Sequence, residues 1–224
     1  MKKPKIFVAC DTTNTKKISK IIKYTESSKL KVGYKFGLEF LNSKNGRKFV
    51  SNLKNKIIFG DYKLADIPKT CMSAIKAVKD LKLNYITIHI SSGLNAIKAA
   101  KKVAGSTKVI GVTILTSLDN RSLKEIGFDK KVGKLVLHQA RLAAKAKLDA
   151  IVCSPHEIKI VKKVFKGEII TPGIRLPNDK KSDQKRVMTP KQAFKNGADV
   201  LVIGRSITSG NIKNNIKKVI NELK

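Results

Sequence analysis

Short apolar runs recur along the whole chain, and lysine-rich amphipathic stretches separate them. The runs are continuous, without polar alternation, which is typical of parallel strands buried on both faces. Eight strands are predicted, at Ile6–Ala9, Leu30–Val32, Ile57–Phe59, Tyr85–Ile90, Val109–Thr113, Ala150–Cys153, Ile169–Thr171 and Val200–Ile203. Helical apolar spacing marks the stretches between strands, for example Lys16–Tyr24, Ser73–Leu81, Asn95–Val103 and the closing Ile212–Leu223.

A strand and a helix repeated eight times in 224 residues predict a single-domain (β/α)8 TIM barrel. A doubly wound open sheet is the alternative. No Gly-x-Gly-x-x-Gly follows the first strand, and no P-loop sequence is present, so dinucleotide and P-loop nucleotide binding are disfavoured. Barrel enzymes build their sites at the carboxyl ends of the strands, and polar residues are found there, among them Asp11, Lys31, Asp61, Lys63, Thr116, Arg175 and Arg205.

A formal net charge of +32 raises the possibility of nucleic-acid binding, because positive charge attracts phosphate backbones. The charge is spread along the chain, however, and only six of the 48 basic residues are arginine. Base readers favour arginine, and single-strand binders need aromatic platforms, yet tryptophan is absent and aromatics make up 5%. We therefore expect no specific nucleic-acid partner.

Location follows from three further features of the sequence. No apolar run approaches the roughly 18 residues that span a bilayer, and the first residues lack the apolar segment of a signal peptide. The three cysteines are scattered and odd in number, which favours neither a disulfide framework nor a zinc site. A cytoplasmic protein without membrane contact is predicted.

The most informative stretch is Asp61-x-Lys63-x-x-Asp66, which directly follows the third predicted strand. Pro68 then begins a helix, a position where its missing N–H costs nothing. A lysine in the second strand, Lys31, lies among apolar residues and needs carboxylate partners. Asp61 and Asp66 are the expected partners, so these four residues are predicted to form a charged tetrad.

Seven pieces of the sequence, two of which contain the tetrad, resemble the orotidine 5′-phosphate decarboxylase family over nearly the whole chain. The pieces occur in this order: Ala9-Cys10-Asp11, Lys31-Val32-Gly33, Asp61-x-Lys63-x-x-Asp66-Ile67-Pro68-x-Thr70, Thr113-Ile-Leu-Thr116-Ser117, Thr171-Pro172-Gly173-Ile174-Arg175, Asp183-Gln184-x-Arg186-x-Met188-Thr189-Pro190 and Val202-Ile203-Gly204-Arg205. No single piece is decisive, but seven in sequence are specific.

The resemblance implies decarboxylation of orotidine 5′-monophosphate to uridine 5′-monophosphate, the last step of de novo UMP synthesis, without metal or cofactor. Lys63 would stabilise and protonate the C6 carbanion, and Asp61 would lie near the substrate carboxylate. Lys31 and Asp66 would keep Lys63 charged. The resemblance also implies a homodimer with shared sites, to which the neighbouring subunit contributes Asp66 and Thr70.

Substrate-binding residues are expected at the other motif positions. Asp11 resembles the family's ribose contact and Thr116 a residue close to the pyrimidine. A long polar segment at about 173–189 is predicted to be a mobile lid that grips phosphate, because barrel phosphate sites use the loops after strands seven and eight. The resemblance assigns phosphate or lid contacts to Arg175, Gln184, Gly204 and Arg205.

Three alternatives stay open at this level. Hexulose-phosphate synthases and keto-gulonate-phosphate decarboxylases share the Asp-x-Lys-x-x-Asp motif but carry an acidic Mg²⁺ ligand where this chain has Lys31. A lysine-rich nucleic-acid-binding protein and a barrel without catalytic activity are the other two. Ala65 and Lys69 depart from residues common in the family, and His89 is either a site residue or a packed core histidine.

Overall fold

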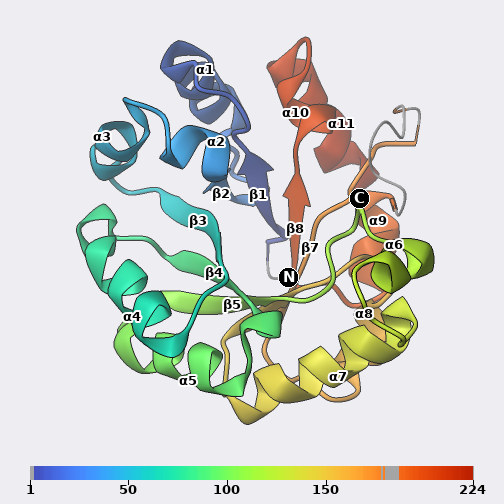
Figure 1. Cartoon of the computed structure of the whole chain (residues 1–224). Helices are drawn as coiled ribbons and strands as arrows, with labels where there is room; N and C mark the ends of the chain where they lie inside the picture. The colour runs from blue at the N-terminus through green and yellow to red at the C-terminus, as the bar shows by residue number, and fades with distance from the viewer. Residues whose placement is uncertain (1–2, 178, 180–186, 224) are drawn as a thin grey trace.

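The structure is a computed structural model that describes residues 3–177, 179 and 187–223. Eight parallel strands form a closed barrel in the order of the sequence (Figure 1), which confirms the predicted (β/α)8 fold. The strands are β1 (Lys5–Ala9), β2 (Lys31–Phe36), β3 (Ile57–Leu64), β4 (Tyr85–His89), β5 (Lys108–Val112), β6 (Ala150–Val152), β7 (Glu168–Thr171) and β8 (Val200–Ile203).

Helices surround the barrel and cover the outer faces of its strands (Figure 1). They are α1 (Thr15–Thr25), α2 (Leu38–Leu41), α3 (Gly46–Ser51), α4 (Pro68–Ala77), α5 (Leu94–Val103), α6 (Asn120–Glu125), α7 (Val132–Lys145), α8 (Ile158–Lys162), α9 (Pro190–Lys195), α10 (Arg205–Thr208) and α11 (Ile212–Glu222), with short 3-10 turns η1 (Lys79–Leu81) and η2 (Ile90–Ser92). The main core lies between strands and helices. In the described part of the chain, no helix is both long and apolar enough to cross a membrane.

Aromatic side chains fill the inside of the barrel. Phe7 packs edge-on against Phe59 and Tyr85, with ring centroids 5.1 and 5.2 Å apart respectively. Gly33 makes room for this cluster, because a Cβ atom there would lie 2.5 Å from the Phe7 ring. Inward-facing residues of β2 must therefore be small at the middle of the barrel, and longer side chains fit only near its two ends.

An ion cluster closes the amino-terminal end of the barrel. The Tyr85 hydroxyl donates to Glu168 at 2.9 Å, and Lys108 donates to the same carboxylate at 2.8 Å. Lys5 contacts both Tyr85 and Glu168. Burial by itself would raise the pKa of Glu168, but its hydrogen bond from Lys108 and the nearby Lys5 charge lower it. These charges are engaged with one another in the barrel floor, far from the carboxyl ends of the strands.

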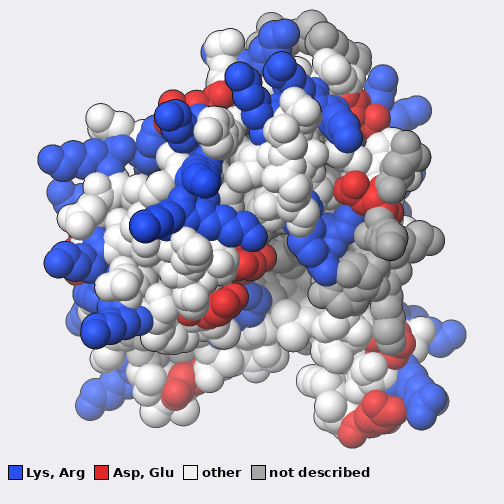
Figure 2. Space-filling view, turned by 90° about the horizontal axis from the view of Figure 1, so that it is seen from above, with Lys and Arg blue, Asp and Glu red and all other residues white. Residues whose placement is uncertain are grey.

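The lysine-rich composition appears as a broadly basic surface. Figure 2 shows Lys and Arg side chains spread over the face seen from above, with Asp and Glu in smaller groups among them. This matches the even spread of lysine along the sequence. Positive surface potential of this kind attracts anions at long range.

Candidate active site

A cavity of about 460 Å³ opens at the carboxyl ends of the strands. It is lined by residues of β1 to β3, the loops after β5, β6 and β7, and the start of α10. Seven of the residues predicted for the site lie around it: Asp11, Asp61, Lys63, Thr116, Arg175, Gly204 and Arg205. The cavity therefore has the position in which barrel enzymes build their active sites.

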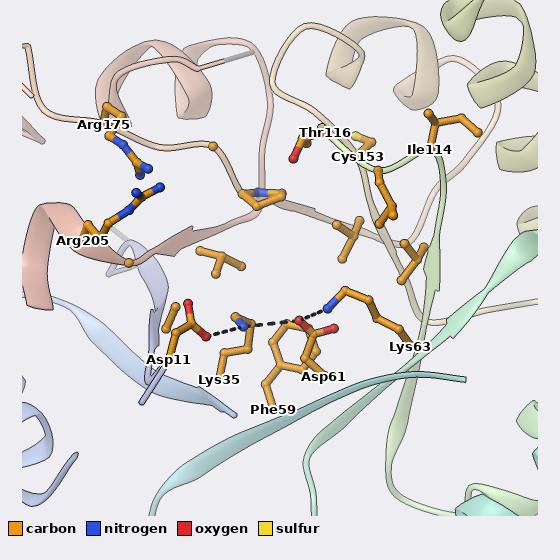
Figure 3. Close-up of a pocket in the computed structure, with 18 residues that line it drawn as sticks. Asp11, Lys35, Phe59, Asp61, Lys63, Ile114, Thr116, Cys153, Arg175 and Arg205 are labelled. Atoms are coloured by element: carbon orange, nitrogen blue, oxygen red, sulfur yellow. Dashed lines mark hydrogen bonds and ion pairs between the residues drawn. The ribbon is translucent and has the colours of Figure 1, made fainter. Parts of the chain in front are cut away.

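Four charged side chains form a continuous row along one wall of the cavity (Figure 3). Lys35 Nζ lies 3.2 Å from Asp11 Oδ1 and 3.3 Å from Asp61 Oδ2. Lys63 Nζ donates to the same Asp61 oxygen at 2.7 Å. Charges alternate along the row, so each ammonium has a carboxylate neighbour and Asp61 is held by two ammonium groups.

The row keeps its buried members ionised. Burial alone would raise the pKa of Asp61, but Lys35 and Lys63 outweigh it, and the net shift is downward. Burial would likewise lower the pKa of Lys35, whereas Asp61 and Asp11 raise it above the ordinary lysine value. A carboxylate and an ammonium are therefore both present at neutral pH in a site largely shielded from water.

A local irregularity of β3 presents both Asp61 and Lys63 to the cavity. Gly60 pairs with Ile86 of β4, but Leu64 pairs with Ile88, so β3 carries two extra residues between these pairs. Lys63 has a φ of +46°, in the left-handed region that non-glycine residues rarely adopt. Bulges of this kind re-aim side chains next to active sites.

The predicted position of Lys31 in the tetrad is wrong. Lys31 is the first residue of β2, pairs with Lys5 in register, and is exposed at the amino-terminal end of the barrel. There it lines a separate hollow together with Tyr85, Lys108 and Glu168. Lys35 occupies the predicted position beside Asp61 instead. It lies four residues further along the same inward face, about 13 Å away at the usual strand rise.

The error has a simple origin in the sequence. The spacing Lys-x-Gly occurs twice within residues 31–37, as Lys31-Val32-Gly33 and again as Lys35-Phe36-Gly37, and the family resemblance points to the first copy. The apolar run predicts a strand that ends at Val32, whereas β2 continues to Phe36. Gly37 would have been a usable signal, since a Cβ there would lie 3.4 Å from Lys35 Nζ and 3.6 Å from Asp11 Oδ1.

Two arginines stand at the side of the cavity formed by β7 and β8. In Figure 3 the guanidinium groups of Arg175 and Arg205 point toward each other. Arg175 is buried and donates to the Ile174 carbonyl at 3.0 Å, whereas Arg205 is exposed at the first position of α10. Paired guanidinium groups beside Gly204 suit a phosphate, whose oxygens accept their N–H groups in bidentate fashion.

A model of the "Orotidine 5′-phosphate decarboxylase / HUMPS family" matches residues 4–219 of the chain. The chain belongs to this family. Orotidine 5′-phosphate decarboxylase of Coxiella burnetii is 41% identical over 217 residues, which cover 92% of this chain and 90% of that protein. The enzyme of the same name from Buchnera aphidicola is 40% identical over 225 residues and covers 96% and 93%.

Solved structures agree with this assignment. The crystal structure of orotidine 5′-phosphate decarboxylase from Lactobacillus acidophilus superposes with a TM-score of 0.82 at 30% identity, over the full length of both chains. The enzyme from Methanocaldococcus jannaschii, complexed with the inhibitor BMP, has a TM-score of 0.78 at 24% identity and supports the fold alone. The barrel described above is thus the architecture found among solved orotidine 5′-phosphate decarboxylases.

Two motif residues of this family lie outside the cavity of the chain. Asp66 and Thr70 are exposed, and Asp66 Oδ1 accepts the Ile67 backbone N–H at 2.7 Å. In this chain Asp66 therefore contacts neither Lys31, as the sequence predicted, nor the cavity. Gln184 lies outside the described residues, as does much of the predicted lid segment.

Sequence reasoning missed several lining residues besides Lys35. Phe59, Ile114 and Cys153 give part of the cavity wall an apolar character, and nothing in their local pattern separates them from ordinary core residues. His89 ends β4 partly buried, and its pKa is lowered by burial and by Lys63, with Asp61 opposing. His89 is absent from the residues that line the cavity in the described part of the chain.

Proposed function

We propose that this protein decarboxylates orotidine 5′-monophosphate to uridine 5′-monophosphate and CO2, the last step of de novo UMP synthesis in the cytoplasm. The observation that carries the proposal is the row Asp11–Lys35–Asp61–Lys63 at the barrel mouth, in one cavity with an arginine pair. The row supplies fixed charges for the reacting carbon, and the arginine pair supplies a site for phosphate. The names of the relatives agree with this substrate.

Loss of CO2 leaves an electron pair in an sp² orbital at C6 of the pyrimidine, where ring delocalisation helps little. The Lys63 ammonium stabilises this carbanion by its charge and then donates a proton to C6, so that the C–C bond electrons end in the new C–H bond. Asp61 faces the departing carboxylate and holds Lys63 in place at 2.7 Å. Lys35 balances the charge of Asp61 and keeps it ionised.

The other cavity residues orient the nucleotide. Asp11 is placed to accept a ribose hydroxyl, and Thr116 stands beside the pyrimidine. Arg175 and Arg205 hold the phosphate together with backbone groups near Gly204. Binding energy from this remote phosphate can then be used to order the site around the reacting carbon.

The proposed reaction needs no metal or cofactor. This separates it from metal-dependent members of the family, whose description names orotidine 5′-phosphate decarboxylase and a second branch, HUMPS. Two ammonium groups, Lys35 and Lys63, already neutralise Asp61. The two ammonium groups would repel a divalent cation at this carboxylate. Hard cations such as Mg²⁺ need negatively charged oxygen ligands that are not already neutralised in this way. The Lys35 position therefore favours decarboxylation without metal.

The direct test follows the ultraviolet absorbance of orotidine 5′-monophosphate with purified protein in excess EDTA. We expect rapid, chelator-resistant loss of substrate with formation of uridine 5′-monophosphate. Keto-sugar phosphates with added Mg²⁺, assayed in parallel, should remain unconverted. A folded protein that is inert toward orotidine 5′-monophosphate, or one that needs Mg²⁺, would contradict the proposal.

We also propose that two chains form a homodimer in which Asp66 and Thr70 complete the site of the neighbouring subunit. Both residues are exposed on the single chain at the start of α4, directly beside Ile67, which is 65% exposed. An exposed large apolar residue among functional-motif residues is typical of a surface that a partner covers. The same carboxylate would then reach the Lys63 of the partner.

Subunit mixing tests this arrangement. Lys63→Ala and Asp66→Asn should each be nearly inactive alone, because every site then lacks one member. After random subunit exchange, half of the dimers are mixed, and each mixed dimer regains one intact site, so the mixture should recover about a quarter of wild-type activity. A mixture no more active than its separate components would show that Asp66 acts within its own chain.

A further inference from the structure

We propose that Thr87 is a positioning residue of this site, whose single hydroxyl group sets the geometry of both Asp61 and Lys63. Thr87 lies in the middle of β4 and is fully buried. Its hydroxyl donates to Asp61 Oδ1 at 3.0 Å and accepts the backbone N–H of Lys63 at 2.8 Å. The inference deepens the proposed function and rests on it for its kinetic test.

The direction of these two bonds follows from chemistry. The Lys63 N–H can only donate, so the Thr87 oxygen accepts it and directs its own proton to the Asp61 carboxylate. This occupies Oδ1 and leaves Oδ2 for the two ammonium groups, Lys35 at 3.3 Å and Lys63 at 2.7 Å. Rotation of the Asp61 carboxylate would break its bonds to all three partners.

The second hydrogen bond, from the Lys63 backbone N–H to the Thr87 hydroxyl, stabilises the backbone of β3. At the irregular part of β3, regular pairing with β4 is interrupted between Gly60 and Leu64. The Lys63 N–H lies in this gap, and its residue has a left-handed φ of +46°. Conformations of this kind persist only where the surroundings hold them in place, and the Thr87 side chain replaces the missing strand hydrogen bond.

Charged or titratable groups from the neighbouring strands surround Asp61. Lys35 comes from β2, Lys63 from β3 itself, His89 from the end of β4, and Asp11, after β1, acts through its ion pair with Lys35. Desolvation by burial raises the pKa of Asp61. The charges of Lys35 and Lys63, together with the Thr87 hydrogen bond, lower this pKa by more, so the net shift is downward. Removing that bond should shift the carboxylate toward its protonated form.

The test compares Thr87→Val, which keeps the shape but removes the hydroxyl, with Thr87→Ser, which keeps the hydroxyl. We expect Thr87→Val to lower kcat about 10- to 100-fold, as loss of one or two buried hydrogen bonds predicts, with KM changed less than about threefold. Thr87→Ser should restore kcat to within about threefold of wild type. The acidic limb of the pH–rate profile should move to higher pH in Thr87→Val only.

Thr107→Val is the matched control, because the Thr107 hydroxyl donates to the Leu83 carbonyl at 2.9 Å, away from the cavity lining. It should leave both kcat and the pH profile unchanged. Carboxyl carbon NMR of Asp61 adds a readout independent of activity, and its titration should move to higher pH in Thr87→Val. If Thr87→Val does not fold, Thr87→Ala takes its place in both measurements.

The outcomes separate the two claims. A wild-type protein inert toward orotidine 5′-monophosphate would reject the proposed function, and the Asp61 titration would still decide the role of Thr87. An active wild type with Thr87→Val of equal kcat, or an Asp61 titration that does not move, would overturn the positioning role. A Thr87→Ser variant as impaired as Thr87→Val would overturn it as well, since the hydroxyl would then not be the group that matters.

Discussion

Replacing Lys35 with alanine is expected to lower kcat/KM for orotidine 5′-monophosphate by about a thousandfold, as removal of one buried catalytic charge typically does. The Lys35 ammonium joins Asp11 and Asp61, at 3.2 and 3.3 Å. Without it, two carboxylates in one cavity wall lose their shared counter-charge. Asp61 would take up a proton more readily, and a negatively charged nucleotide would meet a more negative wall.

Lys31→Ala is the matched control for this experiment. Like Lys35, Lys31 belongs to β2, and the two lie on the same face of the strand. Lys31, however, is exposed at the amino-terminal end of the barrel. We expect wild-type kcat and KM from steady-state absorbance assays of this variant. The reverse pattern, with Lys31→Ala inactive and Lys35→Ala active, would show that the ion row described here is not the reacting site.

The fold was predictable from the sequence because parallel barrel strands are buried on both faces. Continuous apolar runs such as Ile57–Phe59 and Val200–Ile203 therefore stand out from amphipathic helices. The end of a strand is harder to place when its last residues serve the site. β2 continues through Gly33, which makes room for the Phe7 ring inside the barrel, and through Lys35, which faces the cavity. These two residues interrupt the apolar pattern of the strand.

The candidate site was predictable to the extent that its residues follow strands directly. Asp61 and Lys63 come just after the apolar run Ile57–Phe59, although β3 itself extends to Leu64. Arg175 and Arg205 lie in the segments that follow β7 and β8. Thr87 does not, because a β-branched residue in a buried strand has the same local pattern whether it packs or positions a carboxylate. Its role depends on the irregular pairing of β3 with β4, a contact between segments that no local spacing reveals.

Lys63→Ala is expected to have the largest effect of any single substitution, a loss in kcat of about ten-thousandfold or more, because one group acts as both charge stabiliser and proton donor. Lys63 Nζ contacts Asp61 and is partly open to the cavity, with 32% of its side chain exposed. Alanine offers neither charge nor proton at this position. Asp61 would also lose one of the two cations that lower its pKa.

Backbone strain must be separated from chemistry in this variant, since Lys63 has a φ of +46°. Lys82→Ala is the matched control, because Lys82 is an exposed lysine with a φ of +47° far from the cavity lining. Both variants should unfold in urea at similar concentrations, and only Lys63→Ala should lose activity. In heavy water, wild-type product should carry deuterium at C6, the position that Lys63 protonates. A folded Lys63→Ala within tenfold of wild type would mean that another group supplies this proton, and the role of the ion row would then reduce to binding.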